Sequence, residues 1–178
     1  MIGCAGKKLE AWDSMIFRIG TIGPGRLKGA RVSGAVNETM TRFGHPDTLI
    51  RGYERWAVLL RPAQVTLGSL VLVCTEQATA FSEISAAAGT ELHPVVRSIE
   101  STLSALWPYK KINYLMLMMV DPHVHFHVIP RYDHEQHFEG ETFRDAGWPK
   151  LPDLGTAVTL EPTVRDSLVG TLRDHWRG

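Results

Sequence analysis

One segment constrains the fold of this chain more than any other, the sequence HVHFHVI at residues 123–129. Histidine alternates there with an apolar residue at every step, and side chains alternate between two faces with this period in a β-strand. As a strand, the segment places His123, His125 and His127 on one face and valine and phenylalanine on the other. The pattern therefore predicts a sheet that packs one face against helices and gathers three imidazoles on the other.

The apolar patterns around this segment predict an α+β fold. Apolar residues recur at threes and fours between residues 92 and 106, as in a helix with one buried stripe, and Pro94 predicts a start or a kink there. Thr163 is the expected N-cap of a last amphipathic helix. Short apolar runs predict buried strands, and a proline suited to a first turn predicts a short helix. The expected strands are 56–60, 69–74, 112–119 and 123–129, the last closed by Pro130; the short helix is 46–53, and 132–156 is an irregular surface segment.

The length of the chain, 178 residues, suits one domain with an appendage. Its first part is rich in glycine and shows no sustained period, and such a segment loses much backbone entropy on ordering while burying little surface. We expect residues 1–36 to be a poorly ordered N-terminal extension and residues 37–178 to be the folded domain.

The charge balance excludes several classes of partner. Lysine and arginine together number 19, as do aspartate and glutamate, so no overall basic field attracts nucleic acid or a membrane surface. No apolar run reaches the roughly 20 residues of a membrane span, and no signal peptide is expected. Cys4 and Cys74 lack the spacing of a disulfide framework or a zinc ribbon. We therefore expect a cytoplasmic protein without a nucleic-acid or membrane partner.

Three aligned imidazoles have two principal chemical uses. Neutral imidazole attacks phosphorus and forms a phosphoramidate that water still cleaves, while neighbouring imidazoles hold phosphate oxygens or transfer a proton. Imidazole is also the commonest metal ligand, and Asp121 is near enough in the sequence to complete a metal site. The residues favour phosphorus chemistry, with a metal site and a purely structural row as the alternatives.

The run HVHFHVIPR at residues 123–131 resembles the signature of the histidine-triad (HIT) superfamily, in which histidines alternate with apolar residues. The resemblance covers residues 43–132, the core of the domain, and leaves 133–178 as a C-terminal loop and helix. The motif INY at 112–114, followed by PH at 122–123, is similar to bacterial members of the diadenosine-polyphosphate-hydrolase-like branch. The resemblance implies an antiparallel sheet with helices packed on one face and assembly as a homodimer.

The resemblance also implies a role for each histidine. His125, in the middle, forms the covalent nucleotidyl intermediate, while His123 and His127 hold phosphate oxygens and assist proton movement. A histidine rather than a glutamine at the third place favours hydrolysis over the transfer reactions of uridylyltransferases and nucleotide phosphorylases. The implied activity is that of a nucleotidyl hydrolase or transferase on the α-phosphate of dinucleoside polyphosphates or nucleoside phosphoramidates. No cofactor is required, although Mg²⁺ can accompany a polyphosphate substrate.

Two departures from the superfamily pattern concern substrate binding. Gly68-Ser69 stands where many members have Gly-His, which makes the Ser69 hydroxyl the candidate for a phosphate contact, with simple packing as the alternative. Asn113 is the only amide near the expected site and is a second substrate-binding candidate. The alternative is that its side chain hydrogen-bonds to backbone groups at the end of the strand. These departures leave two alternative functions open: a nucleotide-binding regulatory module with little turnover, and a metal-dependent hydrolase that uses the histidines as ligands.

Other residues have structural interpretations. Arg131 is expected to form a structural or rim salt bridge, and the methionines at 116, 118 and 119 are expected to fill the core. Trp148 is expected to cover either the active-site pocket or a dimer partner.

Overall fold

The structure, a computed structural model, describes residues 32–178. The predicted N-terminal extension, residues 1–36, therefore lies outside the described residues except for its last five. Among those five, the backbone N–H of Ser33 donates to the carbonyl of Tyr53 at 3.4 Å. No helix in the described part of the chain is long and apolar enough to cross a membrane.

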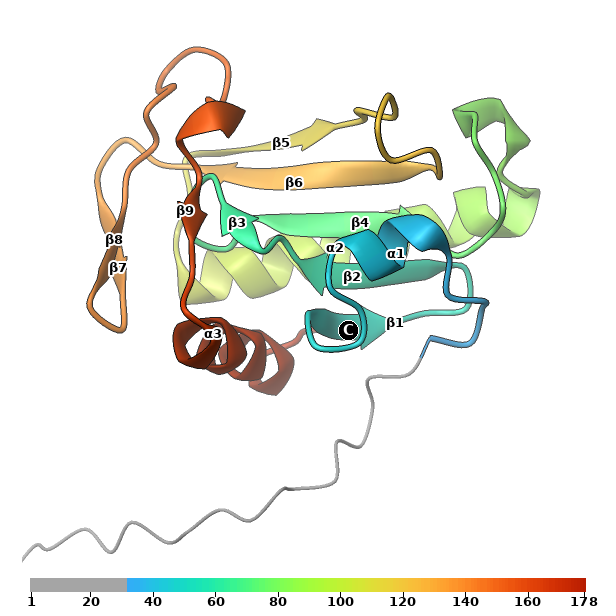
Figure 1. Cartoon of the computed structure of the whole chain (residues 1–178), viewed down its shortest axis with the longest axis horizontal. Helices are drawn as coiled ribbons and strands as arrows, with labels where there is room; N and C mark the ends of the chain where they lie inside the picture. Colours follow the sequence, from blue (N-terminus) through green and yellow to red (C-terminus); the bar gives the residue numbers. More distant parts are fainter. Residues whose placement is uncertain (1–31) are drawn as a thin grey trace, which may run out of the picture.

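A five-stranded antiparallel sheet forms the centre of the molecule, with the strand order β1-β2-β4-β6-β5 (Figure 1). Two small two-stranded sheets flank it, β3 with β9 and β7 with β8. The predicted α+β class with an antiparallel sheet is confirmed. The strands are β1 Leu49–Gly52, β2 Trp56–Leu60, β3 Ala63–Gln64, β4 Leu70–Cys74, β5 Lys111–Leu115, β6 His125–Arg131, β7 Gln136–Phe138, β8 Glu141–Phe143 and β9 Val158–Thr159.

Three α-helices and two 3₁₀ helices complete the fold. The helices are α1 Glu38–Arg42, η1 Phe81–Glu83, α2 Ala86–Leu106, η2 Leu154–Thr156 and α3 Pro162–Asp174. The long helix α2 is capped by Ser85, whose hydroxyl accepts a hydrogen bond from the N–H of Ala88, and Pro94 lies within the helix. Its apolar stripe, including Val95, Ile99 and Leu103, packs against the sheet as predicted.

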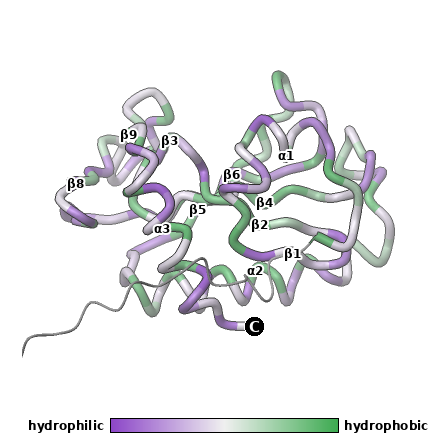
Figure 2. Tube along the Cα trace, turned by 60° about the horizontal axis from the view of Figure 1, so that its bottom comes forward, coloured by the Kyte–Doolittle hydropathy of each residue, from purple (hydrophilic) through white to green (hydrophobic). Residues whose placement is uncertain are grey.

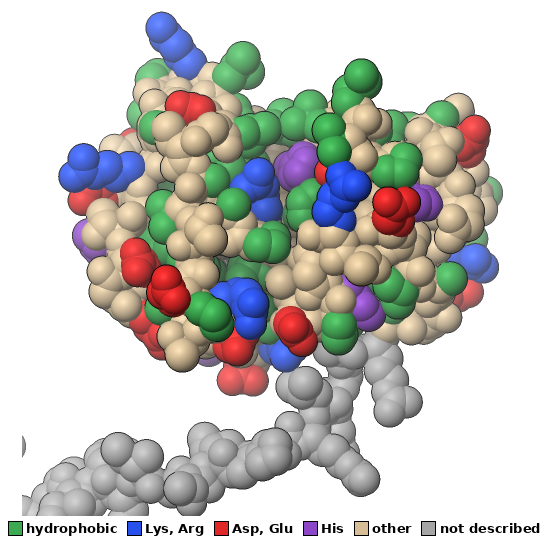
Figure 3. Space-filling view, viewed as in Figure 1, with side chains coloured by type: hydrophobic (Ala, Val, Ile, Leu, Met, Phe, Trp, Pro, Cys, Tyr) green, Lys and Arg blue, Asp and Glu red, His purple; other side chains and the backbone are tan. Residues whose placement is uncertain are grey.

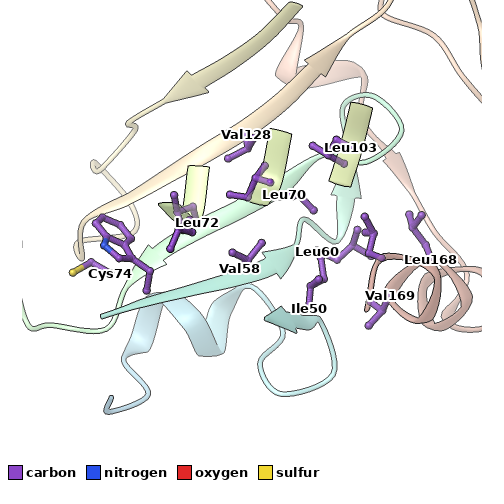
Figure 4. Close-up of a cluster of buried hydrophobic side chains, with 14 of the residues drawn as sticks. Ile50, Val58, Leu60, Leu70, Leu72, Cys74, Leu103, Val128, Leu168 and Val169 are labelled. Atoms are coloured by element: carbon purple, nitrogen blue, oxygen red, sulfur yellow. The ribbon is translucent and has the colours of Figure 1, made fainter. Parts of the chain in front are cut away.

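The main core lies between α2 and the sheet (Figure 4). Alternate residues of the central strands point into it, among them Leu60, Leu72 and Val128, and each is fully buried. Helix α3 adds Leu168 and Val169 at the β1 side of this core, beside Ile50 (Figure 4). Apolar residues are concentrated in the central strands β2 and β4, where every residue is buried (Figure 2).

A smaller core covers part of the opposite face of the sheet. Met40 of α1 packs there on Leu59, Val71 and Val73, the residues that alternate with those of the main core. Helix α1 thus lies over the face opposite α2 (Figure 1). The face that carries the histidines is therefore partly covered by a helix of only five residues.

The short helix predicted at 46–53 is wrong, because residues 49–52 form the edge strand β1. Both Leu49 and Ile50 are buried, at 3% and 2% exposure, one in each core, and only an extended backbone sends neighbouring side chains to opposite faces. The helix instead precedes this strand as α1. Asn37 caps it by accepting a hydrogen bond from the N–H of Met40 at 3.0 Å.

The strands around the histidines are shifted from the predicted bounds. Strand β5 ends at Leu115 rather than at residue 119, and Met119 is 97% exposed, so the prediction that it fills the core is wrong. Strand β6 begins at His125 and runs through Pro130 to Arg131. Proline, which has no N–H to donate, is tolerated there because β4 pairs with β6 only as far as Val128. The Pro130 carbonyl accepts a hydrogen bond from the Thr66 hydroxyl rather than from β4.

The C-terminal part is more regular than predicted. The segment expected to be irregular, 132–156, contains the β7–β8 hairpin. The last helix is confirmed, with Leu168 and Leu172 buried, but it begins at Pro162 with Glu161 at the N-cap position rather than Thr163. Proline is favoured at the first helical position, because an N–H at that position would have no hydrogen-bond partner within the helix.

Candidate active site

The three histidines lie next to one another at the start of β6, on the face that α1 covers. His125 pairs in register with Val73 and His127 with Val71, so both imidazoles share the face of the smaller core. His123 lies two residues before the strand and contacts Thr39 of α1 on that same face. All three are buried: His125 is 0% exposed, His127 7% and His123 9%.

The tautomer of His125 follows from one hydrogen bond. Its Nδ1 lies 2.7 Å from the backbone carbonyl oxygen of His123. A carbonyl oxygen can only accept, so Nδ1 carries the proton and Nε2 carries a lone pair. Nε2 is buried and has no hydrogen-bond partner among the described residues. The site therefore holds an oriented imidazole nitrogen whose lone pair makes no hydrogen bond to the described residues.

His123 uses both of its ring nitrogens on the protein. Nδ1 lies 3.1 Å from the Thr39 hydroxyl, and Nε2 lies 3.1 Å from the side-chain oxygen of Gln77. The backbone N–H of His123 also donates to the Thr39 hydroxyl at 3.3 Å. Since an amide oxygen only accepts, Nε2 is the protonated nitrogen. These bonds fix the backbone at His123, whose carbonyl in turn orients His125.

His127 is held neutral by its surroundings. Burial, reinforced by repulsion from His125 and Arg61, lowers the pKa of His127 to about 4, although Asp121 acts in the opposite direction. Its Nδ1 is buried without a partner in the described part of the chain. A neutral imidazole has one N–H to donate, so His127 is suited to hold a phosphate oxygen without carrying a charge of its own.

Phe43, the residue after α1, packs on the histidine row. Its ring centroid lies 5.8 Å from that of His125 and 5.6 Å from that of His127, in an edge-on arrangement with the latter. Arg42 fastens the same end of α1 to the loop before the row: its Nε lies 3.1 Å from a carboxylate oxygen of Asp121, and it donates to the Val120 carbonyl at 3.3 Å. Figure 3 shows this face, with histidine side chains visible between apolar and basic ones.

The two substrate-binding candidates lie at the other end of the same strands. Ser69 is fully buried; its hydroxyl donates to the Thr66 carbonyl at 2.7 Å and accepts from the Thr66 N–H at 3.1 Å. Asn113 lies on β5 opposite Ile129, on the histidine face, and its side-chain oxygen accepts from Arg131 at 2.9 Å. The structure therefore engages Ser69 within its own loop and leaves only the amide nitrogen of Asn113 for a ligand.

Arg131 forms the structural salt bridge that was predicted. Its guanidinium makes two hydrogen bonds to the carboxylate of Asp145, at 2.6 and 2.9 Å, and both side chains are buried. The bridge joins β6 to the segment that follows β8.

The metal alternative has no geometric support in the described residues. No three histidine, cysteine, aspartate or glutamate side chains there are gathered closely enough to hold an ion. Asp121, the expected additional ligand, pairs with Arg42 instead.

Sequence reasoning missed the residues that support the row. Thr39, Phe43 and Gln77 come from three separate segments that only the fold brings to the histidines. No period or spacing marks them. The one available signal was Asn37, whose position before an acidic residue is typical of an N-cap and would have placed α1.

Solved structures share this architecture. A histidine triad protein from Bradyrhizobium japonicum superposes with a TM-score of 0.62 and 16% identity, over 81% of this chain and 98% of that one. A histidine triad (HIT) protein from Sinorhizobium meliloti also gives 0.62, at 17% identity over 80% and 96% of the two chains. One from Marinobacter aquaeolei gives 0.58, at 18% identity over 80% and 96%. Neither the protein-family models nor the curated protein sequences contain a match.

These likenesses concern architecture, since fewer than one residue in five is identical in each of the three. They extend over nearly the full length of each solved chain, so the shared structure is the whole domain rather than a fragment. The chain has the fold of the histidine triad proteins.

Proposed function

We propose that this chain is a nucleotidyl hydrolase or transferase of the histidine-triad type, which acts on the α-phosphate of a nucleoside phosphate derivative. The substrate is a dinucleoside polyphosphate or a nucleoside phosphoramidate, as in the diadenosine-polyphosphate-hydrolase-like branch. The catalytic unit is residues 37–178, acting in the cytoplasm as a homodimer. One observation supports the proposal: the His123 carbonyl fixes the tautomer of His125, and its Nε2 lone pair has no hydrogen-bond partner among residues 32–178.

The proposed reaction has two steps. In the first, His125 Nε2 forms a bond to the α-phosphorus, the bond from phosphorus to the leaving group breaks, and the leaving group takes up a proton from solvent. The proton stays on Nδ1, which donates it in a hydrogen bond to the His123 carbonyl, and this bond stabilises the positive ring of the intermediate. In the second, water attacks phosphorus and loses a proton to solvent, the phosphorus–nitrogen bond breaks, and nucleoside monophosphate leaves. Transfer results when another acceptor replaces water.

The neighbouring histidines divide the remaining work. Neutral His127 donates its N–H to a phosphate oxygen, and the negative charge of that phosphate raises the tendency of the ring to take up and pass on a proton. Thr39 and Gln77 hold the ring of His123, and His123 orients the nucleophile His125 through its carbonyl. The ring of His123 binds a phosphate oxygen only if its contact with Gln77 is replaced by one with phosphate. No cofactor is required by this scheme. Mg²⁺ enters only as a companion of a polyphosphate substrate.

A second candidate function, a nucleotide-binding module with little turnover, is favoured by one observation. Phe43 packs on His125, which is 0% exposed, so the row is covered in this conformation. In an enzyme, Phe43 and α1 have to give way for phosphorus to reach Nε2. In a binding module, the cover stays and nucleotide occupies the site without reacting.

Turnover measurements separate the candidates. Diadenosine polyphosphates and adenosine phosphoramidates are offered to the wild type and to His125→Ala, with and without a metal chelator. The proposal predicts many turnovers to AMP by the wild type, a loss of several powers of ten in His125→Ala, and phosphoramidate hydrolysis that survives chelation. Stoichiometric binding without turnover identifies a binding module, and activity abolished by chelation on both substrates identifies a metal-dependent hydrolase.

A further inference from the structure

A cavity of about 620 Å³ lies beside the histidine row, at the β5 edge of the sheet. Its floor consists of Lys111, Asn113 and Leu115 of β5 together with Arg131 of β6. In the strand register these residues pair on the same face as the histidines, and Leu115 lies directly opposite His127. Its wall is the segment 148–152, between β8 and η2.

The register places this cavity within reach of a substrate bound at His125. Residues two apart in a strand are roughly 7 Å apart along it. The floor therefore starts at the level of His127 and extends two such steps further, to the level of Arg131. Leu115, which lines the cavity and pairs with His127, is thus the residue at which the cavity meets the histidine row in the strand register.

The charge of the cavity favours an anion. Lys111 and Lys150 line it, and none of the described residues that line it is acidic. Arg131, the third cation, is neutralised by Asp145 and directs the Asn113 side-chain oxygen toward itself. The amide nitrogen of Asn113 is thereby left to donate, so two ammonium groups and one amide are available to phosphate oxygens.

The remaining surface favours a flat apolar body. Trp148, 36% exposed, lines the cavity together with Pro149 and Pro152. An indole stacks on a nucleobase through its π-face, and such contacts are tolerant of the base. Cavities of this volume suit ligands of nucleotide size.

From this arrangement we infer that the cavity binds the leaving half of the substrate, a second nucleoside phosphate, with its phosphates at Lys111, Lys150 and Asn113 and its base on Trp148. The inference rests on the proposed function and narrows it: dinucleoside polyphosphates are preferred over phosphoramidates with a small leaving group. Trp148 was expected to cover either a pocket or a dimer partner, and in this inference it forms part of the wall of a pocket.

The test compares two substrates that differ only in the leaving half, a diadenosine polyphosphate and adenosine phosphoramidate. The variants are Lys111→Met with Lys150→Met, and separately Trp148→Ala. Lys110→Met is the matched control, because Lys110 neighbours Lys111 but pairs with Asp133 and does not line the cavity. We expect KM for the dinucleotide to rise about tenfold or more in the cavity variants, with the phosphoramidate unaffected and the control unchanged on both.

Equal effects on both substrates, or no effect on either, overturn the inference while leaving the proposed function in place. A loss of dimer in the cavity variants at unchanged KM also overturns it and makes the cavity an interface between copies. If the wild type turns over neither substrate, the proposed function fails, and direct titration of the wild type and the lysine variant with the diadenosine polyphosphate decides the cavity separately. Weaker binding by the variant then supports the anion site, and equal binding overturns it.

Discussion

At the scale of single residues, His125 and His127 have the same side chain on the same strand but different surroundings. His125 has a carbonyl partner that fixes its proton, whereas the Nδ1 of His127 is buried with no partner in the described part of the chain and the ring is kept neutral by burial. Keeping the proton off His127 at neutral pH costs the folded state nothing. At acid pH the folded state is destabilised, because His127 binds a proton in the unfolded chain but not in the folded one.

The first prediction at this scale concerns stability at acid pH. The unfolded pKa of histidine is 6.5 and the folded pKa of His127 is about 4. His127 is therefore neutral in both states above pH 6.5 and costs nothing there, whereas the folded state loses about 3 kcal/mol relative to the unfolded state as the pH falls from 6.5 to 4. Denaturant unfolding of the wild type and His127→Gln at pH 7, 5 and 4 measures it. The wild type should lose this much relative to the variant; parallel pH dependences in the two proteins would show that His127 is not held neutral.

The second prediction concerns the buried pair of Arg131 and Asp145. Asp145→Ala leaves the guanidinium buried without its partner, and we expect a loss of about 3–5 kcal/mol in the free energy of unfolding. Adding Arg131→Met removes the stranded charge and should restore part of the loss. The control is Asp133→Ala, at an exposed ion pair with Lys110, which should change stability little. A single variant as stable as the wild type would contradict the structural role of the bridge.

At the scale of elements, α1 decides whether the row is accessible. The helix has five residues and is fastened to the row by Thr39, by Arg42 and by the ring of Phe43. Few apolar contacts hold so short a helix, Met40 being its one side chain in the smaller core, and elements of this kind open at low cost in free energy.

This gives a prediction for Phe43→Ala, in which the ring over His125 is absent. Carbethoxylation of His125, followed by mass spectrometry of the peptide, should be several-fold faster in the variant than in the wild type. Phe81→Ala is the matched control, because Phe81 packs edge-on against Phe126, which points to the opposite face of the sheet. An unchanged rate in Phe43→Ala, or an equal increase in the control, would show that Phe43 does not cover the row.

The sequence predicted those elements whose periodicity decides their structure. Strand β2 matches its predicted bounds, β4 differs by one residue, and the stripe of α2 is buried as expected. Edge elements were harder: β1 has only four residues, and its pairing with β2 outweighs the local preference of a Pro46-initiated helix. The residues of the candidate site were likewise predictable only where a local pattern marks them. The row itself was visible as alternation, whereas Thr39, Gln77 and Phe43 depend on how distant segments pack.

At the scale of the whole molecule, the two faces of one sheet have different tasks. The face toward α2 holds the main core, and the opposite face combines a small core, the histidine row and the cavity at the β5 edge. A substrate that spans the row and the cavity uses the full length of β6. The homodimer that the resemblance implies stays a prediction.

The central claim is that His125 bonds to phosphorus, and trapping the intermediate tests it most directly. The wild type is mixed with a diadenosine polyphosphate, quenched within a single turnover and digested for mass spectrometry. We predict that the peptide containing His125 gains the mass of one adenylyl group, and that His125→Ala shows neither the adduct nor turnover. Rapid turnover without an adduct on this peptide, unaffected by His125→Ala, would contradict the account.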